Sequence, residues 1–442
     1  MNKIEKNKIK TIIEPFKPYI YDVNLSGEIK NLTAPPYDVI SKELQDELYQ
    51  RSQYNIIRLE YGKELQGDDD KENKYTRAAR LFYEWTGKGI LKRAKKSTIY
   101  VYSQIFNIEG IEYERTGFMS LFKLPESKEN NSIYGHEATL SKPKEDRFKL
   151  METANANFSP IFSVFEDDNQ KVLNILKTAV SKKEVKKIFD FIDDSGIRNM
   201  LYAIEDEEII SDIQNKMGDK SVYIADGHHR FETCINYKDY VKKNGLDKKG
   251  INADSCLMFF APSGQKGLVI LPTHRGIKGK NINIENFIEI LSKYFIFKET
   301  NAGDLINENK KTGEKNVSFG FAHKSGRNFI LSFKNETADS KAINPLDNLD
   351  VSILQEYILK KALEITQEEI DNQKYLVYEK DAKKALEKVK KGELEAVFFM
   401  NPTKIEDVIK IASVNLRMPQ KSTYFYPKLI SGLLINPLIK QS

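Results

Sequence analysis

The sequence predicts a mixed α+β fold in which helices and antiparallel strands share a core. Stretches with helix-like and strand-like spacing of apolar residues alternate along the 442 residues, without a repeat of fixed length. No run rich in proline, glycine or serine is long enough to be an obvious linker. Hydrophobic residues make up 40% of the chain, which is enough to fill a substantial core. These observations favour one integrated fold.

Two helices are predicted near the N-terminus. Residues 33–40 contain a pair of prolines that impose an extended backbone, after which Ser41 can cap a helix that runs to about Tyr49. A second helix is indicated by apolar residues at helical spacing, and Gly87 can end it. The apolar residues of this second helix are Ala78, Leu81, Phe82 and Trp85.

Residues 98–106 and 113–122 are predicted to form a hairpin, because the turn between them contains Asn107 and Gly110. A short apolar strand at residues 221–225 is expected to lead into an amphipathic helix that ends near residue 245. Further strands are expected at residues 161–165, 256–261, 268–271, 317–322, 328–333 and 394–400, and further helices at 351–363, 381–391 and 405–411. The polar segments 244–249 and 303–315 are expected to be solvated loops.

A soft boundary is expected after the strand end at residues 272–275. Residues 1–275 would then form a phosphate-binding core with insertions, and residues 276–442 a C-terminal α+β portion that completes the site. One integrated domain is the alternative.

Composition argues against several classes of protein. The 69 basic and 64 acidic residues leave a formal net charge of only +5, whereas nucleic-acid binding predicts a concentrated basic face. Cys234 and Cys256 have no Cys-x-x-Cys partner, so no disulfide framework is expected. The N-terminus lacks the apolar core of a signal peptide, and the apolar stretch at residues 429–439 is too short to span a membrane. A cytoplasmic protein is expected.

The strongest candidate site is the sequence Asp-Gly-His-His-Arg at residues 226–230. A buried strand that ends at a glycine turn and leads into a helix directs backbone N–H groups and the positive end of the helix dipole toward one point. Arg230 can grip phosphate oxygens there, and His228 or His229 can donate to the same group or move a proton. Asp226 can hold Mg²⁺ or take a proton from an attacking hydroxyl.

A structural role for the same residues is the alternative. Asp226 would then cap the helix, and the histidines would pack or face water. His228 with Glu232 and His229 with Thr233 are each four residues apart, so they offer two faces, and only one histidine is expected to point into the site. Neither a Walker loop nor a dinucleotide-binding fingerprint occurs in the required context.

A second cluster lies at residues 135–147, where imidazole, carboxylate, hydroxyl and cationic groups share one expected loop. Such a loop can coordinate a metal or close over a substrate, and a solvated connector is the alternative. The candidates from this loop are His136, Glu137, Thr139 and Arg147.

A third cluster combines a strand end with a segment near the C-terminus. His274 and Arg275 follow a predicted strand and are suited to hold an anion. The proline-bounded segment 418–428 adds cations, hydroxyls and aromatic rings, although an ordinary packed loop is the alternative. Its phosphate-binding candidates are Lys421, Ser422 and Thr423.

With these motifs assembled, the chain resembles the bacterial and archaeal family known as domain of unknown function 1015. The matching segments occur in the family's order at residues 34–40, 136–147, 225–230, 271–275 and 418–428. The central box is also similar to the Gly-x-His-Arg box of the ParB and sulfiredoxin superfamily, which holds nucleotide phosphates. That superfamily includes CTP-hydrolysing partition proteins, sulfiredoxins and kinases that phosphorylate free serine.

The resemblance implies a ParB/sulfiredoxin-like core elaborated with extra antiparallel strands and helices. It implies phosphate contact by Gly227, His229 and Arg230, and it makes Asp38 and Glu60 candidates for a further acid or base. Together with the motif analysis, the nucleotide-binding candidates are Gly227, His229, Arg230, Thr233, His274, Arg275, Lys421, Ser422 and Thr423. The catalytic candidates are Asp226, His228, His229, Asp38 and Glu60, and the metal-ligand candidates are Asp226 and Glu137.

The leading hypothesis is a nucleotide-dependent phosphotransferase that uses ATP or ADP with Mg²⁺ and acts on a small hydroxyl metabolite, with free serine or phosphoserine tested first. A metal-dependent phosphatase or hydrolase is the second, with histidines and a carboxylate around a transition metal. The residues concerned are His136, His228, His229 and His274, with Asp226 or Glu137. A ParB-like nucleotide-binding regulator would need a helix-turn-helix, which is not clear in the sequence. A metabolite-binding protein without turnover is a further alternative.

Overall fold

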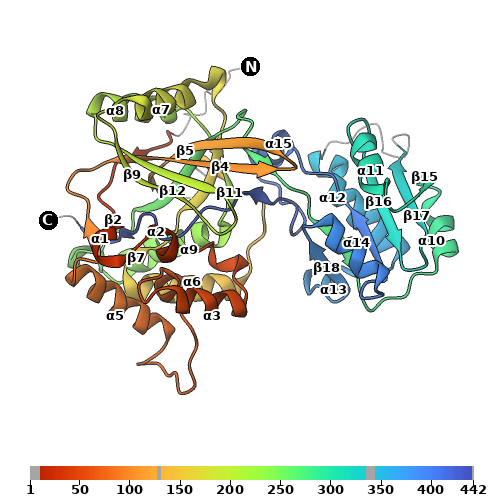
Figure 1. Cartoon of the computed structure of the whole chain (residues 1–442), viewed down its shortest axis with the longest axis horizontal. Coiled ribbons are helices and arrows are strands. Elements are labelled where there is room, and N and C mark those ends of the chain that lie inside the picture. Colours follow the sequence, from red (N-terminus) through yellow and green to blue (C-terminus); the bar gives the residue numbers. More distant parts are fainter. Residues whose placement is uncertain (1–9, 127–130, 335–343, 441–442) are drawn as a thin grey trace. The chain divides into compact units, whose positions relative to one another are not determined.

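The computed structural model describes residues 10–126, 131–334 and 344–440. The chain forms two compact units, each with its own sheet (Figure 1). The first unit consists of Met1–Gly135, Thr139–Val269 and Pro427–Ser442, and the second of His136–Ala138 and Ile270–Tyr426. The predicted mixed α+β fold is confirmed. The division differs from the expected one, because the chain crosses over near residue 269 and residues 427–442 return to the first unit.

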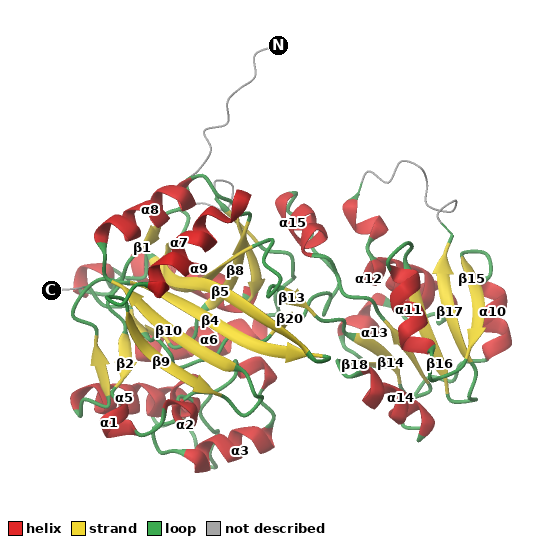
Figure 2. Ribbon diagram, turned by 45° about the horizontal axis from the view of Figure 1, so that its top comes forward, coloured by secondary structure: helices red, strands yellow, loops and turns green. Residues whose placement is uncertain are grey.

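The first unit is built on a nine-stranded sheet (Figure 2). Its strands run in the order β6-β11-β8-β12-β5-β4-β10-β9, and β1 pairs with β5. The pairs β11–β6 and β12–β8 are parallel, and the other pairs are antiparallel. The strands are β1 (Ile13–Glu14), β4 (Ile99–Ile108), β5 (Ile111–Lys123), β6 (Ile133–Tyr134), β8 (Ile161–Phe165), β9 (Lys186–Ile192), β10 (Arg198–Ile204), β11 (Val222–Asp226) and β12 (Ser255–Pro262).

Short strand pairs and helices complete this unit. The pairs are β2 (Tyr19–Tyr21) with β3 (Leu91–Arg93), and β7 (Ala156–Asn157) with β21 (Asn436–Pro437). The helices are α1 (Val23–Ser26), α2 (Ile29–Leu32), α3 (Lys42–Arg51), α4 (Ile57–Glu60), α5 (Lys74–Gly87), α6 (Ser141–Ala154), α7 (Lys171–Ser181), α8 (Glu207–Gly218) and α9 (His228–Lys243), with short 3-10 turns η1 (Tyr37–Val39), η2 (Asp168–Gln170) and η3 (Asp247–Lys249). Helix α6 packs against both α5 and α9, and α9 also contacts β8 and β12.

Continuous apolar runs in the central strands explain the core of the first unit. Every residue of β8 and of β12 is buried, as expected for strands covered on both faces. Side chains of Phe118, Phe260 and Phe165 pack together at the centre, with ring centroids of the first two 5.0 Å apart. Helix α9 adds Phe231 and Val241 to this core. The strand β11 and the helix α9 that carry residues 226–230 are therefore anchored in the most buried part of the unit.

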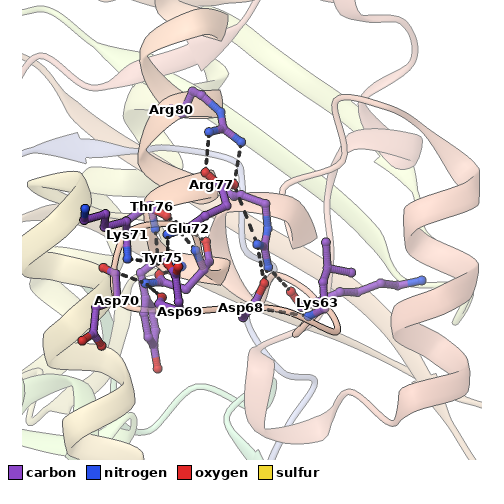
Figure 3. A network of polar contacts seen from close by, with 12 residues as sticks. Lys63, Asp68, Asp69, Asp70, Lys71, Glu72, Tyr75, Thr76, Arg77 and Arg80 are labelled. Atoms are coloured by element: carbon purple, nitrogen blue, oxygen red, sulfur yellow. Dashed lines mark hydrogen bonds and ion pairs between the residues drawn. The ribbon is translucent and has the colours of Figure 1, made fainter.

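The segment after α4 is a loop held rigidly against α5 (Figure 3). Arg77 donates from Nη1 and Nη2 to the two carboxylate oxygens of Asp68, at 2.7 and 2.8 Å, and also to the carbonyl of Lys63. Arg80 makes a similar two-point contact with Glu72, at 2.9 Å on each side. Because planar guanidinium–carboxylate pairs fix geometry, these contacts hold the loop that follows Glu60 in the chain against α5.

The second unit contains a six-stranded antiparallel sheet in the order β15-β17-β16-β19-β14-β18. Its elements are β14 (His274–Ile277), α10 (Ile284–Leu291), β15 (Phe295–Thr300), α11 (Leu305–Gly313), β16 (Ser318–His323), β17 (Asn328–Phe333), η5 (Pro345–Asn348), α12 (Asp350–Ile353), the π-helical η6 (Leu354–Ala362), α13 (Gln367–Asp371), β18 (Leu376–Glu379), α14 (Ala382–Lys390), β19 (Ala396–Phe399), α15 (Ile405–Ser413) and β20 (Phe425–Tyr426). β13 (Val269–Ile270) lies where the chain leaves the first unit.

Alternation along β16 determines how helices cover this second sheet. Phe321 faces Phe287 of α10, with ring centroids 4.9 Å apart. Ala322 points to the opposite face and joins the core formed with Leu305 of α11 and Val389 of α14. The second unit therefore has its own hydrophobic core.

Most predicted elements are confirmed, including the hairpin β4–β5, helices α3 and α5, and the succession of β11 and α9. The predicted loop at residues 303–315 is wrong, because it contains α11, whose Leu305 and Asn309 are buried four residues apart. The expected loop at 135–147 is also wrong in its second half, because α6 begins at Ser141. No helix in residues 10–126, 131–334 or 344–440 is long and apolar enough to cross a membrane.

Candidate functional site

The turn between β11 and α9 forms the centre of the candidate site. Gly227 is the N-cap of α9 and has φ 91°, a left-handed conformation that glycine adopts without strain. A Cβ atom at this position would lie 2.9 Å from Nη2 of Arg230. The glycine therefore permits both the turn and the close approach of the guanidinium. The alternative in which Asp226 caps the helix is wrong, since the cap residue is Gly227 and has no side chain.

Asp226 ends β11 between two cations. Its Oδ2 lies 3.6 Å from Nη2 of Arg230, and its Oδ1 lies 3.3 Å from Nζ of Lys428. The side chain of Asp226 keeps 18% of its surface exposed, compared with 10% for Arg230 and 13% for Lys428. Both cations are therefore nearly buried, while the carboxylate is still reachable from solvent.

The guanidinium of Arg230 uses only part of its hydrogen-bonding capacity within the protein. Its Nη1 donates to Ser159 Oγ at 3.2 Å and to the carbonyl of Pro160 at 2.5 Å. Its Nε is buried and has no hydrogen-bond partner among the described residues. A buried donor without an acceptor is costly, by about 1–3 kcal/mol, so this atom is a place where a ligand oxygen or a water would bind favourably.

A small cavity of about 30 Å³ lies beside Arg230. Its lining is mainly apolar, and the polar residues in it are Glu60, Arg147, Asn157, Ser159 and Arg230. Ser159 Oγ donates to Glu60 Oε1 at 2.8 Å, which joins Glu60 to Arg230 through one hydroxyl. The volume suits one or two water molecules, so the cavity itself is too small for a nucleotide.

Glu60 is a buried carboxylate between two arginines. Arg147 Nη1 lies 3.4 Å from Glu60 Oε1 and donates to the Glu60 carbonyl at 2.7 Å. Burial raises the pKa of Glu60, and the attraction of Arg147 and Arg230 opposes that rise without cancelling it. Arg147 also pairs with Asp146, whose pKa is raised by burial but lowered more strongly by Arg147 and Lys74, to about 2.

The structure places two further candidates, Arg147 and Asp38, in different surroundings. Arg147, proposed as part of a substrate loop, is a buried residue of α6 that faces Glu60 and lies over the ring of Tyr37 at 4.2 Å. Asp38 lies exposed on η1, and no described hydrogen bond or ion pair joins it to Asp226 or Glu60.

The first turns of α9 fix the beginning of α6. His229 Nε2 accepts from the backbone N–H of Leu140 at 2.9 Å, and Thr139 donates to Glu232 at 2.5 Å. His228 is buried with 4% exposure. Thr233 is fully buried and donates to the carbonyl of His229 at 2.7 Å, while its phosphate contact stays a prediction. Thr139 likewise holds the helix start through a carboxylate instead of lining a free loop.

The second unit collects the remaining candidates. His274 Nδ1 accepts from the N–H of Met400 at 3.1 Å, and burial lowers its pKa to about 4. Arg275 donates to the carbonyls of Thr273, Gln420 and Lys421, and burial lowers its pKa to about 10. Both side chains therefore hydrogen-bond to the protein's own backbone. The anion-holding role of this pair stays a prediction.

The segment 418–426 forms a packed loop around Arg275. Ser422 is buried, and its hydroxyl donates to the carbonyl of Pro419 at 2.5 Å. Thr423 Oγ1 lies 3.1 Å from Nε2 of His136, and the Met418 N–H donates to the His136 carbonyl. Lys421 is exposed in a left-handed conformation, and Glu137 is half-buried beside His136. Within the second unit, the segment 418–426 therefore contacts His136 through Thr423 and Met418.

The transition-metal alternative requires several ligands at one point. In residues 10–126, 131–334 and 344–440, no group of three or more histidine, cysteine, aspartate or glutamate side chains has the arrangement of a metal site. The expected cluster of His136, His228, His229 and His274 is therefore not formed. Asp226 remains as a single carboxylate ligand candidate.

Sequence reasoning missed two contributors to the site. Lys428 was recognised only as the end of the segment 418–428, and Ser159 was not singled out at all. Lys428 reaches Asp226 because residues 427–442 return to the first unit, which local sequence patterns do not reveal. The only signal for Ser159 was its place beside Pro160, directly before the buried strand β8.

Comparisons with known proteins identify relatives of this chain. The sequence profile of the family described as protein of unknown function (DUF1015) matches residues 13–352. No curated protein matches the sequence. Among solved structures, a free serine kinase in complex with AMP is 15% identical, with 66% of this chain and 83% of that chain covered and a TM-score of 0.32.

Two other solved structures are similar at the same level. A conserved hypothetical protein from Pyrococcus furiosus is 14% identical, with 70% of this chain and 90% of that chain covered and a TM-score of 0.32. SbnI with a C-terminal truncation, from Staphylococcus aureus, is 9% identical, with 72% and 87% covered and a TM-score of 0.35.

Proposed function

The chain belongs to the DUF1015 family of proteins of unknown function, and we propose that it is a nucleotide-dependent phosphotransferase acting on a small hydroxyl metabolite. One observation carries the proposal: the buried Nε of Arg230 has no partner among the described residues, and it lies at the glycine turn that begins α9. A helix N-terminus with a spare guanidinium donor is suited to phosphate oxygens.

Each part of the turn has a role in this proposal. Gly227 lets the phosphate approach the backbone, and the first amides of α9 and the Arg230 guanidinium bind its oxygens. Asp226 is the partly exposed carboxylate next to that point, so it takes the proton of the acceptor hydroxyl or holds Mg²⁺. A single carboxylate fits Mg²⁺, which usually binds proteins through one or two carboxylates and completes its shell with water and substrate phosphates. When bound, the metal supplies positive charge to the phosphoryl oxygens.

Glu60 acts as a positioning residue in this proposal. It is 3% exposed, which keeps it from the substrate, but it holds Ser159 and Arg147 and, through Ser159, fixes the Arg230 guanidinium. The Glu60→Gln variant is expected to weaken nucleotide binding and leave the choice of acceptor unchanged. ATP and ADP are the first donors to test, and free serine is the first acceptor.

The test has two stages. Isothermal titration calorimetry with ADP and with ATP, with and without Mg²⁺, measures nucleotide binding to the full chain. Phosphorus NMR then follows ATP or ADP with Mg²⁺ and serine, and a phosphomonoester of the acceptor is the expected product. Absence of binding by either nucleotide contradicts the proposal. Release of inorganic phosphate at the same rate with and without acceptors would support the hydrolase alternative instead.

A further inference from the structure

Lys428 is a nearly buried cation whose ammonium group lies 3.3 Å from Asp226. We propose that Lys428 is a second phosphate-binding cation, held by Asp226 until the nucleotide arrives and then transferred to its phosphate. This inference rests on the proposed function and concerns the same site. In this inference Lys428 binds the nucleotide phosphate, and Asp226 loses Lys428 as its partner when the nucleotide binds.

The backbone at Lys428 is fixed by the hairpin β4–β5. Gln104 Nε2 donates to the Lys428 carbonyl at 3.2 Å, and Arg115 Nη2 donates to the preceding carbonyl of Pro427 at 2.5 Å. Arg115 is fully buried, and its guanidinium lies 4.7 Å from the ring centroid of Phe162. Arg115 also donates to Gln104 Oε1, so the two side chains act as one clamp.

The clamp is itself held from a second direction. Gln104 Nε2 donates to Asn199 Oδ1 at 3.1 Å, and the same oxygen accepts from the Tyr102 hydroxyl at 2.6 Å. These residues are buried in β4 and β10. Since the backbone of Lys428 has little freedom, a change of partner must be made by its flexible four-carbon side chain, which ends in three N–H donors.

Charge balance gives the reason for a transfer. Without ligand, the Asp226 carboxylate faces two cations, Arg230 and Lys428, and the buried Arg115 adds positive charge nearby. A nucleotide phosphate brings more negative charge than Asp226 and therefore competes with it for Lys428. Release of Lys428 makes Oδ1 of Asp226, on a partly exposed side chain, available to the acceptor proton or to Mg²⁺.

A double-mutant cycle on ADP binding without Mg²⁺ tests the transfer. The Lys428→Met substitution is expected to weaken ADP binding about 10-fold, because the wild-type lysine must first leave Asp226. In an Asp226→Asn background the same substitution is expected to weaken binding about 100-fold, because there the lysine no longer has to leave the Asp226 carboxylate to bind phosphate. Lys440→Met, at an exposed lysine later in the same C-terminal segment, is the matched control and should leave ADP affinity unchanged.

The cycle separates the possible results. If Lys428 serves only to neutralise Asp226, its removal will weaken binding in the wild-type background and have no effect once the carboxylate has been replaced by an amide. An effect that is equal or smaller in the Asp226→Asn background therefore overturns the inference. Lys428→Arg, which keeps the charge, should bind ADP within about threefold of wild type, and this guards against misfolding of the methionine variant. If the wild-type chain does not bind ADP at all, the proposed function fails first.

Discussion

Arg230 and Arg275 each follow a histidine near the start of a helix or strand, but their side chains have different surroundings. Arg230, in the first turn of α9, contacts Asp226, Ser159 and Pro160 and keeps a buried donor free of partners among the described residues. Arg275, in β14, directs its guanidinium to the backbone carbonyls of a neighbouring loop. Local sequence patterns predict the same role, holding an anion, for both pairs.

The difference lies in what surrounds each guanidinium. A glycine turn exposes backbone amides beside Arg230, and a carboxylate keeps the guanidinium oriented without using all of its donors. Arg275 instead lies within a sheet and closes carbonyls that would otherwise be buried without a donor. We therefore expect a His-Arg pair to bind an anion where a helix N-terminus accompanies it.

The largest expected effect distinguishes the two arginines directly. Arg230→Met should weaken ADP binding by about 100-fold, or about 2.7 kcal/mol, and destabilise the first unit by about 1–3 kcal/mol, because Ser159 and the Pro160 carbonyl lose a buried donor. Arg275→Met should destabilise the second unit by about 1–3 kcal/mol, through carbonyls left without donors, and leave ADP affinity unchanged. Calorimetric titration and denaturant unfolding measure the two quantities.

Binding that is lost in Arg275→Met and retained in Arg230→Met would reverse this comparison. If Arg230→Met does not fold, its ADP affinity cannot be measured, and Arg230→Lys then provides a second variant. It retains the charge but loses the planar fork, so we expect it to fold and to bind ADP about tenfold more weakly.

A pH effect of intermediate size is expected from the histidine of the second pair. Burial lowers the pKa of His274 to about 4, whereas in the unfolded chain it titrates near 6.5. The unfolded state therefore binds more protons between these values, and stability is present above pH 6.5 and lost as the pH falls toward 4. The loss between pH 7 and pH 4.5 is about 2–3 kcal/mol.

Hydrogen exchange of amides in the β14–β19 pair measures this loss in the second unit. His274→Asn is the matched variant, because an amide oxygen can replace Nδ1 as the acceptor for the Met400 N–H but does not titrate. Between pH 4.5 and 7, the stability of the second unit should change less with pH in this variant than in the wild type. The difference should equal the loss that is assigned to His274. An unchanged slope would show that His274 is not the group responsible.

Features that depend on neighbouring residues in the sequence were predicted correctly. The strand, glycine and helix at residues 222–243 follow from a short apolar run, an Asp-Gly turn and helical periodicity, and the structure has them. Helix α11 was missed because its lysines and asparagines resemble those of a solvated loop. Its buried face combines the apolar Leu305 with Asn309, whose amide donates to the Phe399 carbonyl of the neighbouring sheet. Lys428 could not be placed because its contact with Asp226 depends on a return of the chain across about 200 residues.

The smallest expected effect tests whether the glycine turn itself matters for binding. Gly227→Ala places a side chain in a left-handed conformation, at a cost of about 1–2 kcal/mol, and puts its Cβ 2.9 Å from Arg230 Nη2. Gly196→Ala is the matched control in the same unit, because Gly196 also has positive φ but its Cβ would meet nothing within 4 Å. Thermal unfolding should therefore show a similar loss of stability in both variants. Only Gly227→Ala should also weaken ADP binding, by about tenfold, because its methyl group displaces the guanidinium. Equal ADP affinity in the two variants would mean that the Arg230 position over the turn has no part in holding the ligand.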